Sequence, residues 1–100
     1  MDFSEGLAVV KVSDKLGYID TTGKFAIQPH YESGVGIFSE GLAGVKVGDK
    51  VGYIDKTDKL VIQPQYDCAL PFSEGLAQVC VGGKAGYIDK TGKYVWEPSN

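Results

Sequence analysis

The sequence predicts an all-β protein made of three tandem three-stranded antiparallel meanders. The same sequence blocks return three times within 100 residues, which is the pattern of a repeat protein. Inside each copy, apolar residues alternate with other residues at period two, as they do along a β-strand. Residues that favour tight turns, chiefly Gly, Asp and Thr, separate the alternating segments. No segment shows the apolar period of a helix.

The repeat has a nearly constant spacing. FSEGLA begins at residues 3, 38 and 72, and GYID begins at residues 17, 52 and 86. The period is therefore 35 residues and then 34, because the connection after the first copy is one residue longer. We expect a single repeat domain over residues 1–100, with units at 3–37, 38–71 and 72–98.

Each unit begins with a strand that reads LAVVKV (7–12), LAGVKV (42–47) or LAQVCV (76–81). One face of this strand carries Ala, Val and Val in all three copies, so we expect that face to point into the core. The other face is mixed, and we expect its variable middle residue to meet solvent or a partner. A two-residue turn of Ser, Gly or Asp then starts a hairpin, since these residues tolerate positive φ.

The second and third strands of each unit are joined by a second turn. GYID supplies the second strand, and its Asp opens a turn in which it accepts backbone N–H bonds while a Gly takes the left-handed position. In the middle copy that Gly is Asp58, which adopts this conformation with some strain. The third strands are expected at 25–28, 60–63 and 94–97, each ended by a Pro. Tyr31 and Tyr66, two residues after a Pro, are expected to pack back on the sheet.

The units need one another, because a single meander buries too little apolar surface to fold alone. We favour an open curved repeat array; the alternative is a closed pseudo-threefold barrel or propeller-like ring. An open array leaves two terminal faces, and neither end of this chain has a polar cap. Three outcomes stay open: continuation of the array in a longer protein, self-association, or closure of the three units on one another.

Composition bears on the classes of partner. All ten cations are Lys, with no Arg, and most stand beside turns near Asp, so no nucleic-acid partner is expected. The longest apolar run covers four residues, 7–10, so no membrane span is expected. The first residues lack the pattern of a secretory signal; the compartment is left open, with the cytoplasm favoured.

A family resemblance follows from the motifs. Lys-x-Gly-Tyr-Ile-Asp-Lys-Thr-Gly-Lys, an apolar strand, Pro-x-Tyr-(Asp/Glu) and Phe-Ser-Glu-Gly-Leu-Ala follow one another over essentially the whole chain. This series resembles the bacterial WG repeat, also called KWG repeat. The family usually has Trp before the Gly, where this chain has Leu16, Val51 and Ala85, so packing there must differ. The resemblance implies a β-rich module that supports interactions, with no shared catalytic residues.

The recurring tyrosines are the candidate contact residues for a ligand or partner: Tyr18, Tyr53 and Tyr87. Regularly spaced aromatic rings can line a groove and stack on sugars or on peptide side chains. The competing interpretation is that a recurring Tyr on a half-buried strand packs in the core with its hydroxyl tied to a neighbour. We favour packing for these positions and keep the groove as the alternative.

The other candidate residues have structural interpretations. His30 is expected to be an exposed loop residue, far from any nucleophile. Cys68 and Cys80 do not recur in other copies and are expected to be free thiols. The two recurring carboxylate sets are expected to cap turns and to lie in solvated turns, rather than to bind calcium or act as acid–base pairs: Asp20, Asp55, Asp89, and Glu5, Glu40, Glu74.

These observations predict a non-enzymatic β-repeat scaffold or protein–protein interaction module. No cofactor or metal is expected, and the partner is a protein or a second copy of the chain. The alternative is a carbohydrate or cell-wall binding module that uses the recurring tyrosines. A hydrolase is not expected, since no pair of groups has an evident shared site.

Overall fold

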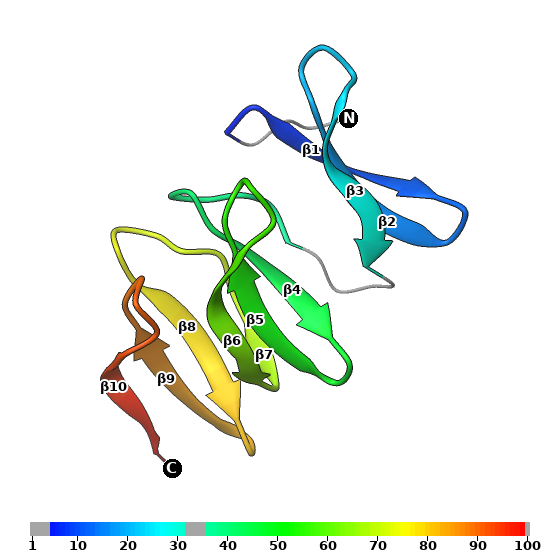
Figure 1. Cartoon of the computed structure of the whole chain (residues 1–100). Helices are drawn as coiled ribbons and strands as arrows, with labels where there is room; N and C mark the ends of the chain where they lie inside the picture. The colour runs from blue at the N-terminus through cyan, green and yellow to red at the C-terminus, as the bar shows by residue number, and fades with distance from the viewer. Residues whose placement is uncertain (1–4, 32–35, 100) are drawn as a thin grey trace.

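The protein is an open array of three antiparallel β-sheets. The computed structural model describes residues 5–31 and 36–99, with side chains up to residue 96; Phe3 and Ser4 of the first FSEGLA block lie outside the described residues. The sheets follow one another from the N-terminus to the C-terminus (Figure 1), and the molecule measures 43 × 26 × 21 Å. The described residues contain no helix, and therefore none that could span a membrane. None of the sheets closes into a barrel across these residues, so the favoured open array is confirmed.

Each sheet is a meander with its strands in chain order. The first sheet has the order β1-β2-β3, the second β4-β5-β6, and the third β10-β9-β8-β7. Every pairing is antiparallel. The strands are β1 Leu7–Val12, β2 Lys15–Asp20, β3 Phe25–Tyr31, β4 Ala43–Val47, β5 Lys50–Ile54, β6 Leu60–Tyr66, β7 Cys68–Ala69, β8 Ala77–Val81, β9 Lys84–Ile88 and β10 Tyr94–Ser99.

The short strand β7 was not expected from the sequence. It lies inside the expected second unit, yet it pairs with β8 and extends the third sheet. The chain reaches it because the segment after β6 turns back along the edge of β8, with the Leu70 N–H bonded to the Gln78 carbonyl. The corresponding bond before the second sheet joins the Gly36 N–H to the Gly44 carbonyl. The connection between units is therefore anchored to the first strand of the following unit.

The predicted turns are confirmed by their backbone and side-chain bonds. In the first hairpin Ser13 and Asp14 both have positive φ, as a two-residue turn matched to strand twist requires. In the second turn Oδ1 of Asp20 accepts bonds from the Thr22 N–H, the Thr22 hydroxyl and the Lys24 N–H. The same three bonds recur at Asp55 and Asp89. Capping of the turn is thus the observed role of these carboxylates.

The Gly of the GYID block is required by a close approach of two backbones. A Cβ on Gly52 would lie 2.5 Å from the Ile62 carbonyl oxygen and 2.7 Å from the Pro64 nitrogen, and Gly17 has the same surroundings. The approach is possible because β6 shifts register opposite this residue. Pro64 therefore does not end the third strand, as the sequence suggested; the strand bulges past it and continues to Tyr66.

The core lies between the sheets rather than inside any one of them. One cluster joins Tyr18 and Ile27 of the first sheet to Val45 and Ile54 of the second. The other joins the second sheet to the third in the same way, with Tyr53 and Ile62 in the places of Tyr18 and Ile27, and Val79 and Ile88 in the places of Val45 and Ile54. Each sheet therefore folds against its neighbours.

The middle sheet is covered on both faces, which corrects the expectation for its first strand. Ala43 and Val45 are buried as predicted, but Val47, at the end of the same face, is exposed. Leu42 points the other way and is also buried, as is Leu7 in the first sheet. The Leu of the second face is buried because the following sheet packs there, and the middle residue of that face, Gly44, is half-buried.

The close approach at Gly52 leads to a direct test. Gly52→Ala is expected to lower the free energy of unfolding by about 3 kcal/mol, since backbone atoms of β6 occupy the space that the new Cβ needs. The matched control is Gly44→Ala on the neighbouring strand, where the nearest atom lies 3.6 Å away. We expect this variant to be unchanged or about 0.5 kcal/mol more stable. Urea unfolding followed by circular dichroism measures both; equal losses would contradict the account.

Candidate functional site

The contacts that join the sheets determine which surfaces of the described array are buried and which stay exposed. At each junction a Tyr from the middle strand of one sheet meets a Phe that precedes the first strand of the next. The rings of Tyr18 and Phe38 lie 4.8 Å apart at 67°, and those of Tyr53 and Phe72 lie 4.9 Å apart at 67°. All four side chains are buried. Such edge-to-face pairs add to the gain from apolar burial alone.

The same tyrosines donate a hydrogen bond to the following connection. The Tyr18 hydroxyl donates to the Gly36 carbonyl at 2.6 Å, and the Tyr53 hydroxyl donates to the Leu70 carbonyl at 2.7 Å. Burial raises the pKa of both phenols, because it disfavours the phenolate. The packing interpretation therefore describes Tyr18 and Tyr53, whose rings no ligand can reach from the surface.

A carboxylate makes the third contact at each junction. Glu5 accepts hydrogen bonds from the Glu40 and Gly41 N–H groups at 2.6 and 2.8 Å. One repeat later, Glu40 accepts the same pair of bonds from Glu74 and Gly75, at the same distances. These backbone bonds lower the pKa of both receiving carboxyls, with the Gly N–H the larger cause in each case. Glu5 and Glu40 thus join units, a role that their assignment to solvated turns missed.

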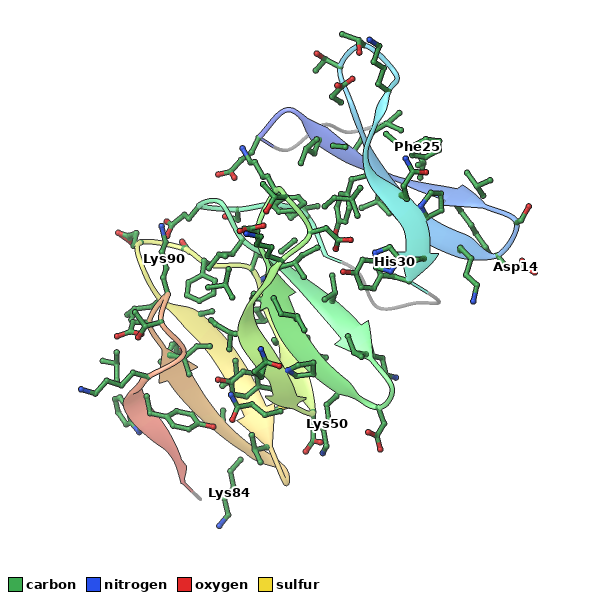
Figure 2. All side chains as sticks on the ribbon, viewed as in Figure 1. Asp14, Phe25, His30, Lys50, Lys84 and Lys90 are labelled. Carbon is green, nitrogen blue, oxygen red and sulfur yellow. A yellow bond between two sulfur atoms is a disulfide. The ribbon has the colours of Figure 1, made fainter. Side chains whose placement is uncertain are left out.

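A lysine of the following unit lies next to each of these carboxylates. Lys56 approaches Glu5 to 3.6 Å, and Lys90 approaches Glu40 to 3.5 Å. In Figure 2, Lys90 reaches away from the third sheet toward the second. Because these side chains are well exposed, the pairs stabilise the junction only slightly.

All of these contacts run in one direction, from one unit to the next along the chain. The third sheet therefore keeps a set of contact residues with nothing packed on it among the described residues. Leu76, Tyr87 and Trp96 occupy the positions of Leu42, Tyr53 and Ile62, and we call these three residues the end face. Their exposed fractions are 37%, 39% and 66%, whereas their counterparts in the second sheet are at most 6% exposed.

The single histidine belongs to the first junction and not to a free loop. His30 lies in β3, at the end that approaches the second sheet (Figure 2). Its Nε2 is 2.7 Å from Oδ2 of Asp58, and the Tyr31 hydroxyl donates to Oδ1 of the same carboxylate. Sequence reasoning noted the unusual Asp58 without finding its partners. The signal that could have identified the pair is that two residues without a counterpart in the other copies, His30 and Asp58, occur in adjacent copies.

These residues line an open groove between the first two units. The groove has a volume of about 550 Å³, and its lining includes Lys15 and Lys46 beside His30 and Asp58. At the second junction Gln65 and Gly92 take the places of His30 and Asp58. Tyr66, the counterpart of Tyr31, therefore meets no carboxylate, and its buried hydroxyl has no hydrogen-bond partner among the described residues. The pair of His30 and Asp58 is thus specific to the first junction.

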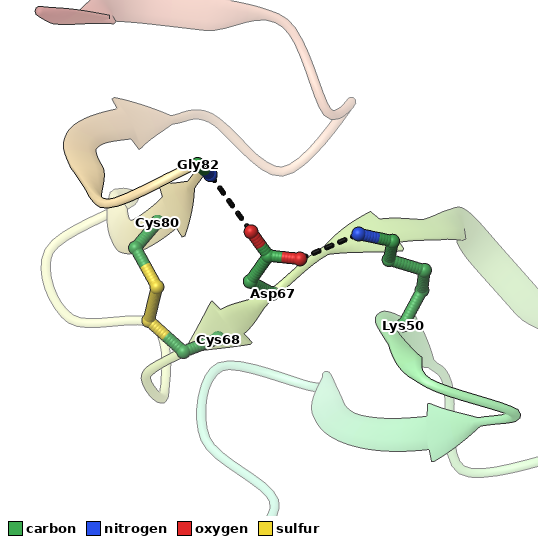
Figure 3. Close-up of a disulfide and its surroundings, with 5 residues drawn as sticks. All are labelled: Lys50, Asp67, Cys68, Cys80 and Gly82. Atoms are coloured by element: carbon green, nitrogen blue, oxygen red, sulfur yellow. Dashed lines mark hydrogen bonds and ion pairs between the residues drawn. A yellow bond between two sulfur atoms is a disulfide. The ribbon is translucent and has the colours of Figure 1, made fainter.

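The expectation of free thiols is wrong. Cys68 of β7 and Cys80 of β8 are directly opposite in the ladder and form a disulfide with a Cα–Cα distance of 5.1 Å (Figure 3). Beside the disulfide, one carboxylate oxygen of Asp67 accepts a hydrogen bond from the Lys50 ammonium group, and the other oxygen accepts one from the Gly82 N–H. The missed signal is positional, since both cysteines lie six residues from Glu74 at the corner where the chain turns back.

The remaining predicted candidates are placed without a shared chemical site. His30 lies at the first junction, whereas the cysteines are bonded to each other near the second. Within the described residues, no group of three His, Cys, Asp or Glu side chains is placed to hold a metal ion. Of the three candidate tyrosines, Tyr87 alone has a substantial exposed surface, so the ligand-contact prediction now depends on that residue.

Comparison with protein families agrees with this architecture. The family model for the WG containing repeat matches twice, at residues 17–50 and 52–84, which is about two thirds of the chain. The chain belongs to the WG containing repeat family. It is therefore a β-repeat module. No curated protein and no solved structure matches it. In these WG repeats the usual Trp position holds the half-buried Leu16 and Val51 and the exposed Ala85.

The Tyr–Phe contact can be tested by truncating its Phe. Phe38→Ala is expected to lower the free energy of unfolding by about 3–5 kcal/mol, because it leaves a cavity at the first junction. Phe25→Ala is the control, since that ring is 41% exposed, and we expect a loss below about 1 kcal/mol. Chemical denaturation of the two variants gives the comparison. A small effect at Phe38 would show that the junction does not depend on this ring.

The carboxylate contact predicts a pH dependence. The Glu40 pKa is lowered in the folded chain, so its contribution to stability is complete above the unfolded value and is lost as the pH falls through the folded value. Glu40→Gln should therefore be less stable than the natural chain at neutral pH, and the difference should shrink as the pH falls below the ordinary Glu pKa of about 4.3 and the Glu40 carboxylate is protonated.

The control for this measurement is Glu74→Gln. Among the described residues the Glu74 carboxylate accepts no hydrogen bond, so this variant is expected to keep the stability of the natural chain. Thermal unfolding between neutral and acidic pH distinguishes the two variants. Parallel curves for natural chain and Glu40→Gln at all pH values would contradict the assignment.

Proposed function

We propose that the chain is a non-enzymatic protein–protein interaction module that binds its partner through the end face. The observation that carries this proposal is a contrast in exposure at equivalent positions. Tyr53 is completely buried by the following unit, while Tyr87 is 39% exposed at the same place in the third sheet. The equivalent surface of the second sheet is buried by another sheet of the same protein, so the end face has the residues of a protein-binding surface.

The chemistry of the end face fits a protein partner. Aromatic side chains with polar neighbours are enriched at the centres of protein interfaces, where they fill pockets and exclude water. Tyr87 and Trp96 lie directly opposite each other on neighbouring strands, and Leu76 adds an aliphatic surface. Glu74 precedes Leu76 by two residues, at the repeat position of Glu5 and Glu40, and supplies a carboxylate for orientation.

The use of the polar residues supports a non-enzymatic role. Glu5 and Glu40 are engaged by backbone N–H groups, and the three recurring Asp side chains cap turns. His30 and Tyr31 are both bonded to Asp58. These groups therefore contribute to folding and to the joining of units.

A second candidate function is carbohydrate binding. Its support is the pair of exposed rings, Tyr87 and Trp96, which stand opposite each other as a platform for stacking on a sugar. The pair is confined to the third sheet, since Ile27 and Ile62 replace the Trp in the other two. A carbohydrate would therefore bind at one end of the array and not along its length.

Site-specific cross-linking tests the proposed function. A photoreactive residue at position 96 is expected to form a discrete adduct with another protein in extract from cells that produce the chain. The same residue at position 61 is the control, because Val61 is 44% exposed on β6 of the second sheet and does not belong to the end face. Adding Leu76→Arg should abolish the adduct at 96. Equal labelling at both positions would contradict the proposal.

Fluorescence of the single Trp separates the two candidates. Trp96 is exposed, so a sugar that stacks on it should change its emission in a saturable way. Titration with oligosaccharides at about millimolar concentration covers the weak end of the expected affinities. A saturable change in Trp96 emission that disappears in the Tyr87→Ala variant would favour carbohydrate binding over a protein partner.

A further inference from the structure

The first sheet carries an uncovered face that complements the end face. At both junctions the unit that follows contributes a Val from its first strand and an Ile from its second, and these are fully buried: Val45 and Ile54, then Val79 and Ile88. In the first unit the same positions are Val10 and Ile19, which are only partly buried. We call these two residues the head face. Among the described residues, no sheet packs on them as the preceding sheet packs on their counterparts.

The first unit also carries the backbone turn that receives a carboxylate. Glu40 and Gly41, whose N–H groups bind Glu5, have φ values of 54° and 83°. Glu5 and Gly6 have φ values of 54° and 79°, so their N–H groups are arranged in the same way. At the opposite end of the molecule, Glu74 stands in the position of Glu5 and Glu40. Donor and acceptor of one further junction are thus present on one chain.

We infer that the end face of one chain binds the head face of a second copy, so that chains associate head to tail. The inference rests on the proposed function and names the partner of its surface. In the contact, Tyr87 and Leu76 of one chain pack on Val10 and Ile19 of the next, and the Glu74 carboxylate accepts hydrogen bonds from the Glu5 and Gly6 N–H groups of that next chain. The two internal junctions supply the geometry for each of these contacts.

Two substitutions distinguish this contact from the internal junctions. Thr21 stands where Lys56 and Lys90 approach a carboxylate, so the contact between chains lacks that ion pair. Because exposed ion pairs contribute little, this loss is small. Trp96 replaces the Ile of the other two units and offers a larger apolar area. The change in area favours association, although a contact between separate chains also costs translational and rotational freedom.

The symmetry of the contact predicts the form of the assembly. The head face and the end face are different surfaces, so the contact is heterologous and each added chain presents a new end face. The internal junctions repeat without closing, and a contact of the same geometry continues the array. The mass should therefore grow gradually with concentration rather than stop at a dimer.

Sedimentation of the purified full chain tests the inference. The weight-average mass is expected to rise above the 10.7 kDa of one chain as the concentration increases from about 10 µM to about 1 mM. Leu76→Arg blocks the end face, and Val10→Arg blocks the head face, and each is expected to weaken association at least about tenfold. Circular dichroism shows whether each variant is folded. Glu74→Lys, which changes only an exposed side chain, serves as a second end-face variant.

A mixture of the two blocked variants gives the decisive result. Leu76→Arg keeps its head face and Val10→Arg keeps its end face, so the mixture should form one intact contact and stop at a heterodimer. A face-to-face contact between identical surfaces would not be restored by mixing, and that outcome would overturn the inference. A natural chain that stays at one-chain mass up to about 1 mM would also overturn it. The proposed function would still stand in that case if the cross-link at position 96 captured a different protein.

Discussion

Every part of this structure depends on the requirement that a three-stranded sheet with two apolar faces be covered on both sides. A single meander cannot meet this requirement, and across the residues that the structure describes only the middle sheet meets it fully. The packing between sheets includes specific aromatic and polar contacts as well as apolar burial. A Tyr ring packs edge-to-face with a Phe ring, the Tyr hydroxyl donates to a backbone carbonyl, and a carboxylate accepts from two N–H groups, with nearly identical distances at both junctions. Apolar area gives the junction its stability, and the polar contacts fix its orientation.

The sequence was sufficient for features that repeat, because three copies of one pattern report the same local geometry three times. The meanders, the hairpin turns, the Asp-capped turns and the open order of the sheets were all predicted. The left-handed position of Asp58 followed from its alignment with Gly23 and Gly92. The third strands were cut short, since the rule that Pro ends a strand ignores a bulge opposite Gly52. Local rules therefore failed where two backbones approach each other closely.

Features that occur once were beyond the same reasoning. The disulfide between Cys68 and Cys80 depends on β7 turning back along β8, and no other copy has the pair. The bond between His30 and Asp58 joins residues 28 apart whose approach is set by how two sheets pack. The end face is also a product of position, because Tyr87 is identical in type to Tyr53 and differs in that no following sheet covers it among the described residues. A repeat pattern describes what the units share, whereas candidate sites arise where they differ.

The one-directional order of the junction contacts has a consequence for how such a gene can change in length. A tandem duplication of one 34-residue unit places a new sheet between two existing ones, and both of its faces find the surfaces they require. Removal of the middle unit likewise brings together two faces that already fit. Inversion or shuffling of parts of a unit has no such compensation, because the Tyr and its Phe partner come from different copies. Unequal recombination within the array is therefore structurally neutral to first order, and array length is free to vary in steps of whole units.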